Sequence, residues 1–192
     1  MLFNSYTFIF AFLPVALLGY ALIGRTQSRV AVLSWLIAVS VAFYGLWNPI
    51  SLLIILPSVA VNYLLARWMQ ARTAAGAEGD RQCTWILTLG IVFNLCFLGY
   101  FKYKNFFLDS ANELFGTQFA LVATILPLGI SFITFQKIAF LVDVRVGTIR
   151  KFDAFDFLIF VFFFPQLIAG PIVHYREMVP QFNAASQRLQ AS

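Results

Sequence analysis

The sequence predicts an all-α membrane protein, a polytopic bundle of transmembrane helices. Hydrophobic residues make up 61% of the 192-residue chain and charged residues only 11%, whereas soluble domains carry about a quarter charged residues. The apolar residues gather into runs of roughly the 20 residues that a helix needs to cross a bilayer. Tyr and Trp mostly lie near the ends of these runs, where amphipathic rings favour the lipid–water interface. A water-soluble domain is therefore excluded.

Three apolar segments occupy the first third of the chain. We expect spans over Tyr6–Ile23, Val30–Trp47 and Ile50–Met69, with the second ending at the Asn48-Pro49 turn signal. The N-terminus lacks the positive region and the cleavage site of a secretory signal. The first run is therefore predicted to be a retained membrane helix.

The middle of the chain alternates polar and apolar stretches. Gln70–Gln82 is predicted to be a solvated loop because it is the most polar stretch, and Cys83–Tyr100 is the fourth predicted span. The following polar region, which begins at Lys102, has the composition of an interfacial helix.

The last two of the six apolar segments carry helix breakers. Phe119–Val142 is interrupted at Pro127 and Gly129, and Phe157–Val173 contains two prolines and a glycine. Proline removes a backbone donor and distorts a helix, so both segments are expected to be broken or re-entrant. Residues 1–182 are predicted to form one transmembrane unit, and residues 183–192 form a polar tail or a truncation point.

Lys and Arg residues indicate how the chain is oriented. If all six segments span and the N-terminus faces outward, the inward loops carry eight of these residues and the outward loops carry four. The inward set is Arg25, Arg29, Arg67, Arg72, Arg81, Arg145, Arg150 and Lys151, and the outward set is Lys102, Lys104, Arg176 and Arg188. Since cytoplasmic loops are enriched in positive charge, an outward N-terminus is expected.

Five polar residues follow the break in the fifth segment. They are Ser131, Thr134, Gln136, Lys137 and Asp143. Polar side chains in membrane helices usually face the protein interior or a wet cavity, but Ser131 and Thr134 are also explained by bonds to helix carbonyls or by helix–helix contacts. Lys137 is close enough to its segment end to snorkel to the headgroups. Gln136 is expected to be buried, and Asp143 to mark a helix terminus or to pair with an arginine.

The sixth segment is a candidate lining for an internal tunnel. It contains Gly170 and Pro171 and leads to His174, the only histidine. Irregular backbone at membrane depth is tolerated only where protein or a water-filled cavity surrounds it. A lone histidine is more often structural than catalytic, and the only carboxylate at helical spacing is Glu177.

No metal or nucleic-acid site is predicted. One histidine and two distant cysteines, Cys83 and Cys96, do not supply a closed metal site. The positive residues, which give a net charge of +5, are spread between apolar segments and do not form a patch for nucleic acid. From these residues alone, an enzyme, a transporter and a scaffold all remain possible.

Several long motifs follow one another in the order found in one family. They are MLFNSYTFIF at 1–10, FYGLWNP at 43–49, GYFKY at 99–103, LPLGISFITFQ at 126–136, LVDV at 141–144 and FFPQLIAGPIVHYREMVPQF at 163–182. In these motifs the chain resembles the membrane-bound O-acyltransferase family, in particular its bacterial alginate O-acetyltransferase branch.

The resemblance implies a multi-pass enzyme of the bacterial inner membrane. Members of the family move an acyl group from a donor on the cytoplasmic side, such as acetyl-coenzyme A or another thioester, to a hydroxyl acceptor. The alginate branch acetylates an exported polysaccharide together with periplasmic partner proteins, and D-alanylation of teichoic acid is a sister use.

The resemblance also implies that this chain is the N-terminal portion of such an enzyme. The family's catalytic histidine lies in a later half, so no catalytic residue is expected here and the chain alone is expected to be inactive. His174 is not that histidine. The implied wall or support residues of a tunnel are Ser131, Thr134, Gln136, Lys137, Asp143, Gly170, Pro171 and His174. The alternatives are a non-catalytic scaffold or truncated paralogue and a small membrane carrier.

Overall fold

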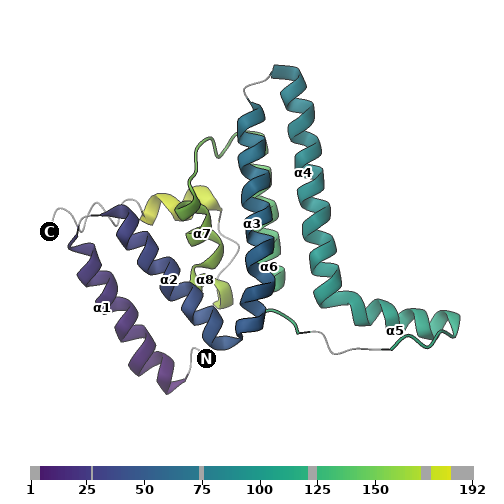
Figure 1. Cartoon of the computed structure of the whole chain (residues 1–192), viewed down its shortest axis with the longest axis horizontal. Coiled ribbons are helices and arrows are strands. Elements are labelled where there is room, and N and C mark those ends of the chain that lie inside the picture. The colour runs from purple at the N-terminus through teal and green to yellow at the C-terminus, as the bar shows by residue number, and fades with distance from the viewer. Residues whose placement is uncertain (1–4, 27, 74–75, 121–124, 170–173, 183–192) are drawn as a thin grey trace.

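A computed structural model describes residues 5–26, 28–73, 76–120, 125–169 and 174–182, and its regular elements in these ranges are helices (Figure 1). In chain order they are η1 (Phe8–Phe12), α1 (Leu13–Gly24), α2 (Arg29–Trp47), α3 (Pro49–Arg72), α4 (Gly76–Leu98), η3 (Gly99–Tyr103), α5 (Lys104–Phe115), α6 (Ile130–Val146), α7 (Ala154–Phe162) and α8 (Phe164–Ala169). Residues 175–182 are also helical.

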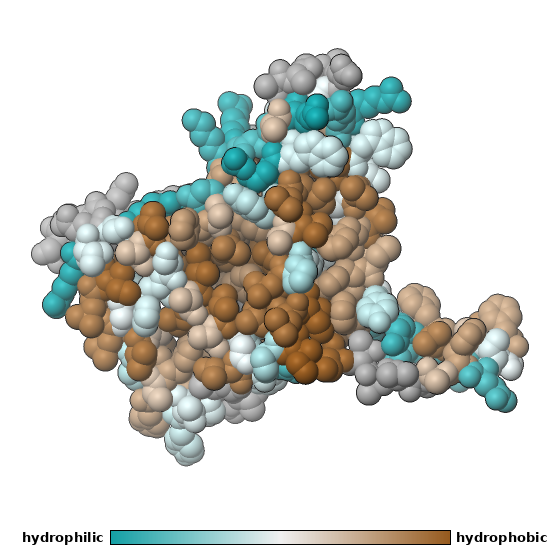
Figure 2. Space-filling model, in the orientation of Figure 1, coloured by the Kyte–Doolittle hydropathy of each residue, from teal (hydrophilic) through white to brown (hydrophobic). Residues whose placement is uncertain are grey.

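Three helical stretches of the described chain are long and apolar enough to cross a membrane. They are Arg29–Trp47, Pro49–Arg72 and Gly79–Phe115, while Phe8–Gly24 and Ala154–Gln166 are shorter apolar helices. Figure 2 shows hydrophobic side chains over the body of the bundle and hydrophilic ones gathered at its upper end. The prediction of a polytopic helical membrane protein is confirmed.

The helices form two packed groups around α2 and α3. Helices α3, α4 and α6 pack against one another, while α2 contacts α1, α7 and α8 (Figure 1). A cluster of aromatic rings joins the second group, because Phe43 lies 5.7 Å from Phe8 and 5.3 Å from Phe164 between ring centres. Residues from η1, α2 and α8 thus share one core.

The prediction of a solvated loop over Gln70–Gln82 is wrong for most of its length. Helix α3 continues to Arg72, and α4 begins at Gly76. The stretch contains no proline and several residues that favour helix, so each helix extends past its apolar run into the polar region. Residues 74–75 lie outside the described part.

The break predicted in the fifth segment is confirmed. Gly129 adopts a left-handed conformation with φ of 65°, and α6 begins at the next residue. That conformation is easily adopted only by glycine, which lacks a Cβ atom. Residues 116–120 and 125–127 before it are not helical.

The sixth segment is broken at Phe163, two residues before the expected Pro165. Helix α7 ends at Phe162 and α8 begins at Phe164. The backbone N–H of Phe164, the first residue after the break, donates to the Ser40 hydroxyl at 3.3 Å. Backbone groups at membrane depth need such partners inside the protein.

The described residues that flank this segment, Asp156 and Tyr175, lie at the same end of the bundle, so the segment is re-entrant. The Tyr175 hydroxyl hydrogen-bonds Asp156 at the start of α7, and its ring centre lies 5.7 Å from that of Phe160. The placement of Arg176 with the outward residues depended on all six segments spanning, and this condition is not met. Arg176 follows Tyr175 at the end that carries Arg29 and Arg145, because the sixth segment does not cross. Arg188 lies outside the described residues.

A close contact between α1 and α2 depends on glycine. A Cβ atom at Gly19 would lie 2.1 Å from the Trp35 ring. That ring is held in place by its indole N–H, which donates to the Ala16 carbonyl at 3.0 Å.

We expect Gly19→Ala to lower the free energy of unfolding by about 1–3 kcal/mol, because the new methyl group overpacks the helix contact. Thermal unfolding in detergent measures the effect. Gly45→Ala is the matched control, since the nearest side-chain atom to its new Cβ is 3.6 Å away in Leu52. Equal stability of the two variants would contradict the importance of this contact.

Candidate functional site

Polar residues occur along the whole length of α6, and contacts with other helices hold its N-terminal end in place. The carbonyl of Leu128, two residues before the helix, accepts a hydrogen bond from the hydroxyl of fully buried Tyr44 in α2. Ser131 in the first turn accepts from the Lys102 ammonium at 3.1 Å. The start of α6 is thereby tied to α2 and to η3.

Lys137 points into the bundle, so the snorkelling alternative is wrong. Its side chain is 1% exposed, its ammonium donates to the Ser58 hydroxyl of α3, and the Phe97 ring centre lies 5.2 Å from Nζ. The residue lies in the middle of α6, which packs against both α3 and α4. The rotation of α6 about its axis directs the Lys137 side chain into the bundle, although the end of the helix is within reach of the side chain.

A buried pair of asparagines extends the polar contact around Ser58. The Asn94 amide donates to Asn62 Oδ1 at 2.6 Å, and the Asn62 amide donates back to Asn94 Oδ1 at 3.3 Å. Both side chains are 0% exposed. Sequence reasoning missed this pair, although an isolated asparagine within each of two apolar runs was a visible signal. Such amide bonds hold membrane helices together.

Two further buried polar groups on α6 have incomplete hydrogen bonding. Gln136 donates to the Phe160 carbonyl at 3.3 Å, but its Oε1 has no protein partner among the described residues. The Thr134 hydroxyl is also without a hydrogen-bond partner within the described ranges. Buried polar groups are nearly always paired with protein, water or a ligand. The structure thus leaves Thr134 Oγ1 and Gln136 Oε1 as buried polar atoms without a partner in the described ranges.

Asp143 and His174 meet at the other end of α6. Asp143 Oδ2 lies 3.7 Å from His174 Nδ1, and the histidine side chain is half exposed. The carboxylate beside His174 therefore belongs to Asp143, 31 positions earlier in the sequence, and not to Glu177. Asp143 in turn lies beside His174 and not beside the arginine that was one of its expected partners. The return of the re-entrant segment to this end makes the contact possible.

An ion-pair cluster fixes the same end of the bundle. Arg29 at the start of α2 pairs with Asp153 at 3.0 Å and also with Asp156. Burial raises the pKa of the Asp153 carboxyl, but hydrogen bonds from the Asp156 backbone and from Arg29 outweigh it and hold the pKa below its usual value. The Asp153 carboxylate therefore stays charged at neutral pH, whereas burial and the neighbouring Asp153 charge raise the pKa of Asp156. The pairs with Arg29 join α2 to α7.

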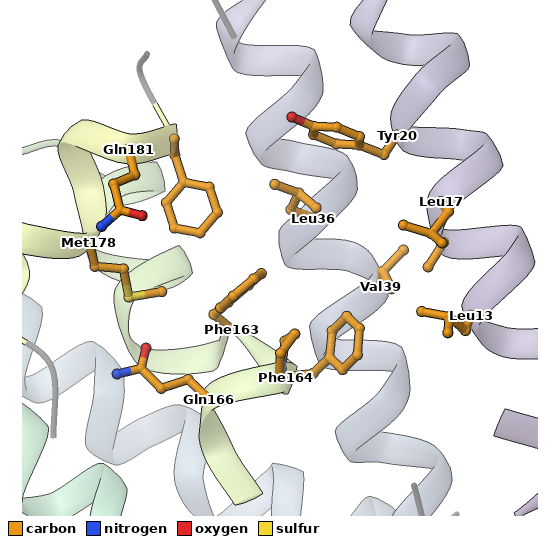
Figure 3. A pocket seen from close by; sticks show the side chains of 13 residues that line it. Leu13, Leu17, Tyr20, Leu36, Val39, Phe163, Phe164, Gln166, Met178 and Gln181 are labelled. Atoms are coloured by element: carbon orange, nitrogen blue, oxygen red, sulfur yellow. The ribbon is translucent and has the colours of Figure 1, made fainter. Parts of the chain in front are cut away.

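An apolar groove of about 700 Å³ lies on the other group of helices (Figure 3). It is lined by α1, α2, the start of α8 and the helix 175–182, and its polar side chains are Tyr20, Gln166 and Gln181. The predicted wall residues do not line it. Gly170 and Pro171 lie outside the described residues. The described candidates therefore form a polar track along α6, although they do not share one face: Lys137 contacts Ser58 of α3, whereas Gln136 contacts the Phe160 carbonyl of α7. Ser131 lies at one end of the helix, and Asp143 with His174 lies at the other.

Comparison with known proteins gives a consistent result. The model of MBOAT, the membrane-bound O-acyltransferase family, matches residues 82–192. The chain is 41% identical over 188 residues to the probable alginate O-acetylase AlgI of Pseudomonas aeruginosa, which covers 95% of this chain and 35% of that protein. It is 36% identical over 209 residues to the peptidoglycan O-acetyltransferase of Helicobacter pylori, covering 95% of this chain and 39% of that protein.

A more distant similarity covers part of the chain. It is 30% identical over 106 residues to the teichoic acid D-alanyltransferase of Lacticaseibacillus rhamnosus, which amounts to 55% of this chain and 24% of that protein. The chain spans a little over a third of the length of the two O-acetyl-transferring relatives. No solved structure matches the chain.

The contact between Lys137 and Ser58 predicts an asymmetric response to mutation. Ser58→Ala leaves the buried ammonium without its recorded acceptor and is expected to lower the free energy of unfolding by about 1–3 kcal/mol. Lys137→Met removes the charge but keeps the stem, and replacing a buried charge with an apolar side chain is often neutral or stabilising. Thermal unfolding of the purified chain in detergent compares the two.

The double variant Lys137→Met/Ser58→Ala is the control for a direct interaction. We expect the Ser58→Ala penalty to disappear in the Met background, since no buried ammonium then needs an acceptor. Additive effects of the two substitutions would show that the hydrogen bond is not the source of the penalty.

Proposed function

The chain belongs to the membrane-bound O-acyltransferase family, and we propose that residues 1–182 form the N-terminal part of the transmembrane domain of an O-acetyltransferase. The acetyl group would pass to hydroxyl groups of an exported polysaccharide. The relatives that align with almost the whole chain support this proposal, because by name they are alginate and peptidoglycan O-acetyl-transferring enzymes.

The polar track along α6 is the observation that carries the proposal. Helix α6 runs between the two ends of the bundle and buries a lysine, a threonine and a glutamine, with two polar atoms lacking protein partners in the described chain. Such a helix has the chemistry of a wall beside a substrate route. The re-entrant segment packs against it through the Gln136–Phe160 contact. The apolar groove is a weaker candidate for the route because only three of its lining side chains are polar.

In this proposal the chain positions the reactants and does not supply the acid–base group. Transfer breaks the thioester bond of the donor, forms an ester with the acceptor oxygen, and moves the hydroxyl proton to a base. We propose that this base lies outside these 192 residues, as the family resemblance implies. Acetyl-coenzyme A or another thioester is the donor that we propose, and Ser131, Thr134 and Gln136 are the residues that we expect to contact donor or acceptor.

We further propose that the protein lies in the bacterial inner membrane with its arginine-rich end in the cytoplasm. Arg29, Arg72 and Arg145 lie at that end, as does Arg176 because the sixth segment is re-entrant. Lys102 and Lys104 lie at the opposite end. Positive residues are enriched on the cytoplasmic side, so the donor would enter at the Asp143–His174 end and periplasmic acetylation proteins would act at the other.

Deletion of the gene that encodes this chain tests the function. We expect base-labile acetate to disappear from the exported polysaccharide, because the acyl group would no longer cross the membrane. Acetate released from purified polysaccharide and from purified peptidoglycan is measured in parallel. Loss from peptidoglycan alone would overturn the assigned acceptor, and loss from neither polymer would overturn the O-acetyltransferase proposal.

Complementation separates the role of this chain from that of the whole enzyme. Expression of residues 1–192 alone in the deletion strain is expected not to restore acetylation, whereas the complete gene does. Restoration by residues 1–192 would contradict the proposal that the acid–base group lies elsewhere.

Reporter fusions test the topology. Green fluorescent protein fused after Lys151 or after Phe182 is expected to fluoresce, and alkaline phosphatase fused after Gly116 is expected to be active. The Phe182 fusion is decisive for the re-entrant segment, because a sixth segment that crosses the membrane would instead give active phosphatase at that position.

A further inference from the structure

Helix α5 projects from the end of α4 as an arm that leaves the bundle (Figure 1). None of its 12 residues is buried. Its large apolar side chains are strongly exposed: Phe106 and Phe107 at 64% and 63%, and Leu114 and Phe115 at 77% each. Exposed apolar side chains concentrated on one short helix indicate a surface that another phase or molecule covers.

The side chains of the arm are segregated by face. With roughly 100° between successive helical residues, Phe106, Phe107 and Leu114 fall within one arc of about 100°. Asp109, Asn112 and Glu113 fall within a second such arc on the other side of the helix. A helix with one apolar and one charged face is suited to lie in the plane of a membrane interface.

The base of the arm lies where α4 has completed its crossing. The apolar run Cys83–Tyr100, which follows the charged first part of α4, gives a length of about 27 Å at 1.5 Å per residue, close to the hydrocarbon core of about 30 Å. The run ends within η3, where Lys102 lies 5.3 Å from the Tyr103 ring centre and Lys104 lies 5.4 Å from that of Tyr100. Tyrosine and lysine together are typical of the lipid–water boundary.

Two sets of hydrogen bonds hold the arm at this level. Lys102 donates to Ser131 at the start of α6, which fixes the base against the bundle. At the tip, Asn112 Oδ1 accepts from the Phe119 backbone N–H at 2.8 Å and from the Thr117 hydroxyl at 2.9 Å. The chain that leaves the helix is thereby folded back onto it.

We propose that α5 is an in-plane anchor whose partner is the headgroup boundary of one leaflet, the leaflet at the Asn48 and Leu128 end of the bundle. Phe106, Phe107 and Leu114 enter the acyl boundary, and Asp109 and Glu113 face water. Lys102 and Lys104 lie at the level of the headgroups, whose phosphates complement their charge. The anchor sets the depth of η3 and, through Ser131, the depth at which α6 begins. This assignment is independent of the acyltransferase proposal.

Site-directed fluorescence in lipid vesicles tests the anchor. Phe107→Cys and Leu114→Cys are each labelled with an environment-sensitive fluorophore, with Asp109→Cys and Glu113→Cys as matched controls from the opposite face. The parent chain carries Cys96→Ala, while Cys83 is 3% exposed and is left in place. Because no residue of α5 is buried, these substitutions do not depend on core packing.

Labels at 107 and 114 are expected to be quenched about twofold or more by a lipid with a nitroxide near its glycerol, and less by one with the nitroxide at the chain end, because an interfacial helix enters only about 5–10 Å. Labels at 109 and 113 are expected to be quenched by aqueous iodide instead. Iodide quenching at all four positions would overturn the anchor. So would labels at 107 and 114 that are shielded from both quenchers, which would indicate a protein partner or a second copy.

Discussion

The burial of polar groups at membrane depth constrains the rest of this structure. Lys137, Asn62 and Asn94 are fully buried, and α3, α4 and α6 bring hydrogen-bond partners to them. In a bilayer, apolar side chains favour lipid and protein contacts almost equally, and specific polar contacts therefore help to decide which helices associate. The amide pair joins α3 to α4, and the Lys137–Ser58 bond joins α6 to α3.

The same constraint explains the irregular segments. The start of α6 exposes the Leu128 carbonyl, which Tyr44 binds, and the break before α8 exposes the Phe164 N–H, which Ser40 binds. Both partners come from α2. Helix α2 therefore supplies the hydrogen-bond partners at both of these places where the backbone is not helical, and it also packs against α7 and α8.

Family membership and the structure carry different parts of the functional argument. The match over residues 82–192 and the relatives that cover 95% of the chain identify the family. The structure adds where the family-matching segments lie relative to one another: α6 crosses the bundle, the segment after it turns back, and Asp143 and His174 meet where the two return to the same end. Asp143 and His174 therefore lie at one end of α6, and Thr134, Gln136 and Lys137 are buried farther along it.

The sequence by itself determined the membrane class, the approximate positions of the apolar segments, and the break at Pro127 and Gly129. These features are local, because they depend on run length, on composition and on the left-handed conformation that glycine adopts easily. It also indicated that Gln136 is buried. Only the tertiary structure decided that Lys137 points inward to Ser58, that Asp143 faces His174, and that the sixth segment returns with Arg176 to the end where it entered. Each of these depends on the rotation of a helix about its axis or on contacts between residues far apart in the chain, and neither is fixed by a local pattern of apolar and polar residues.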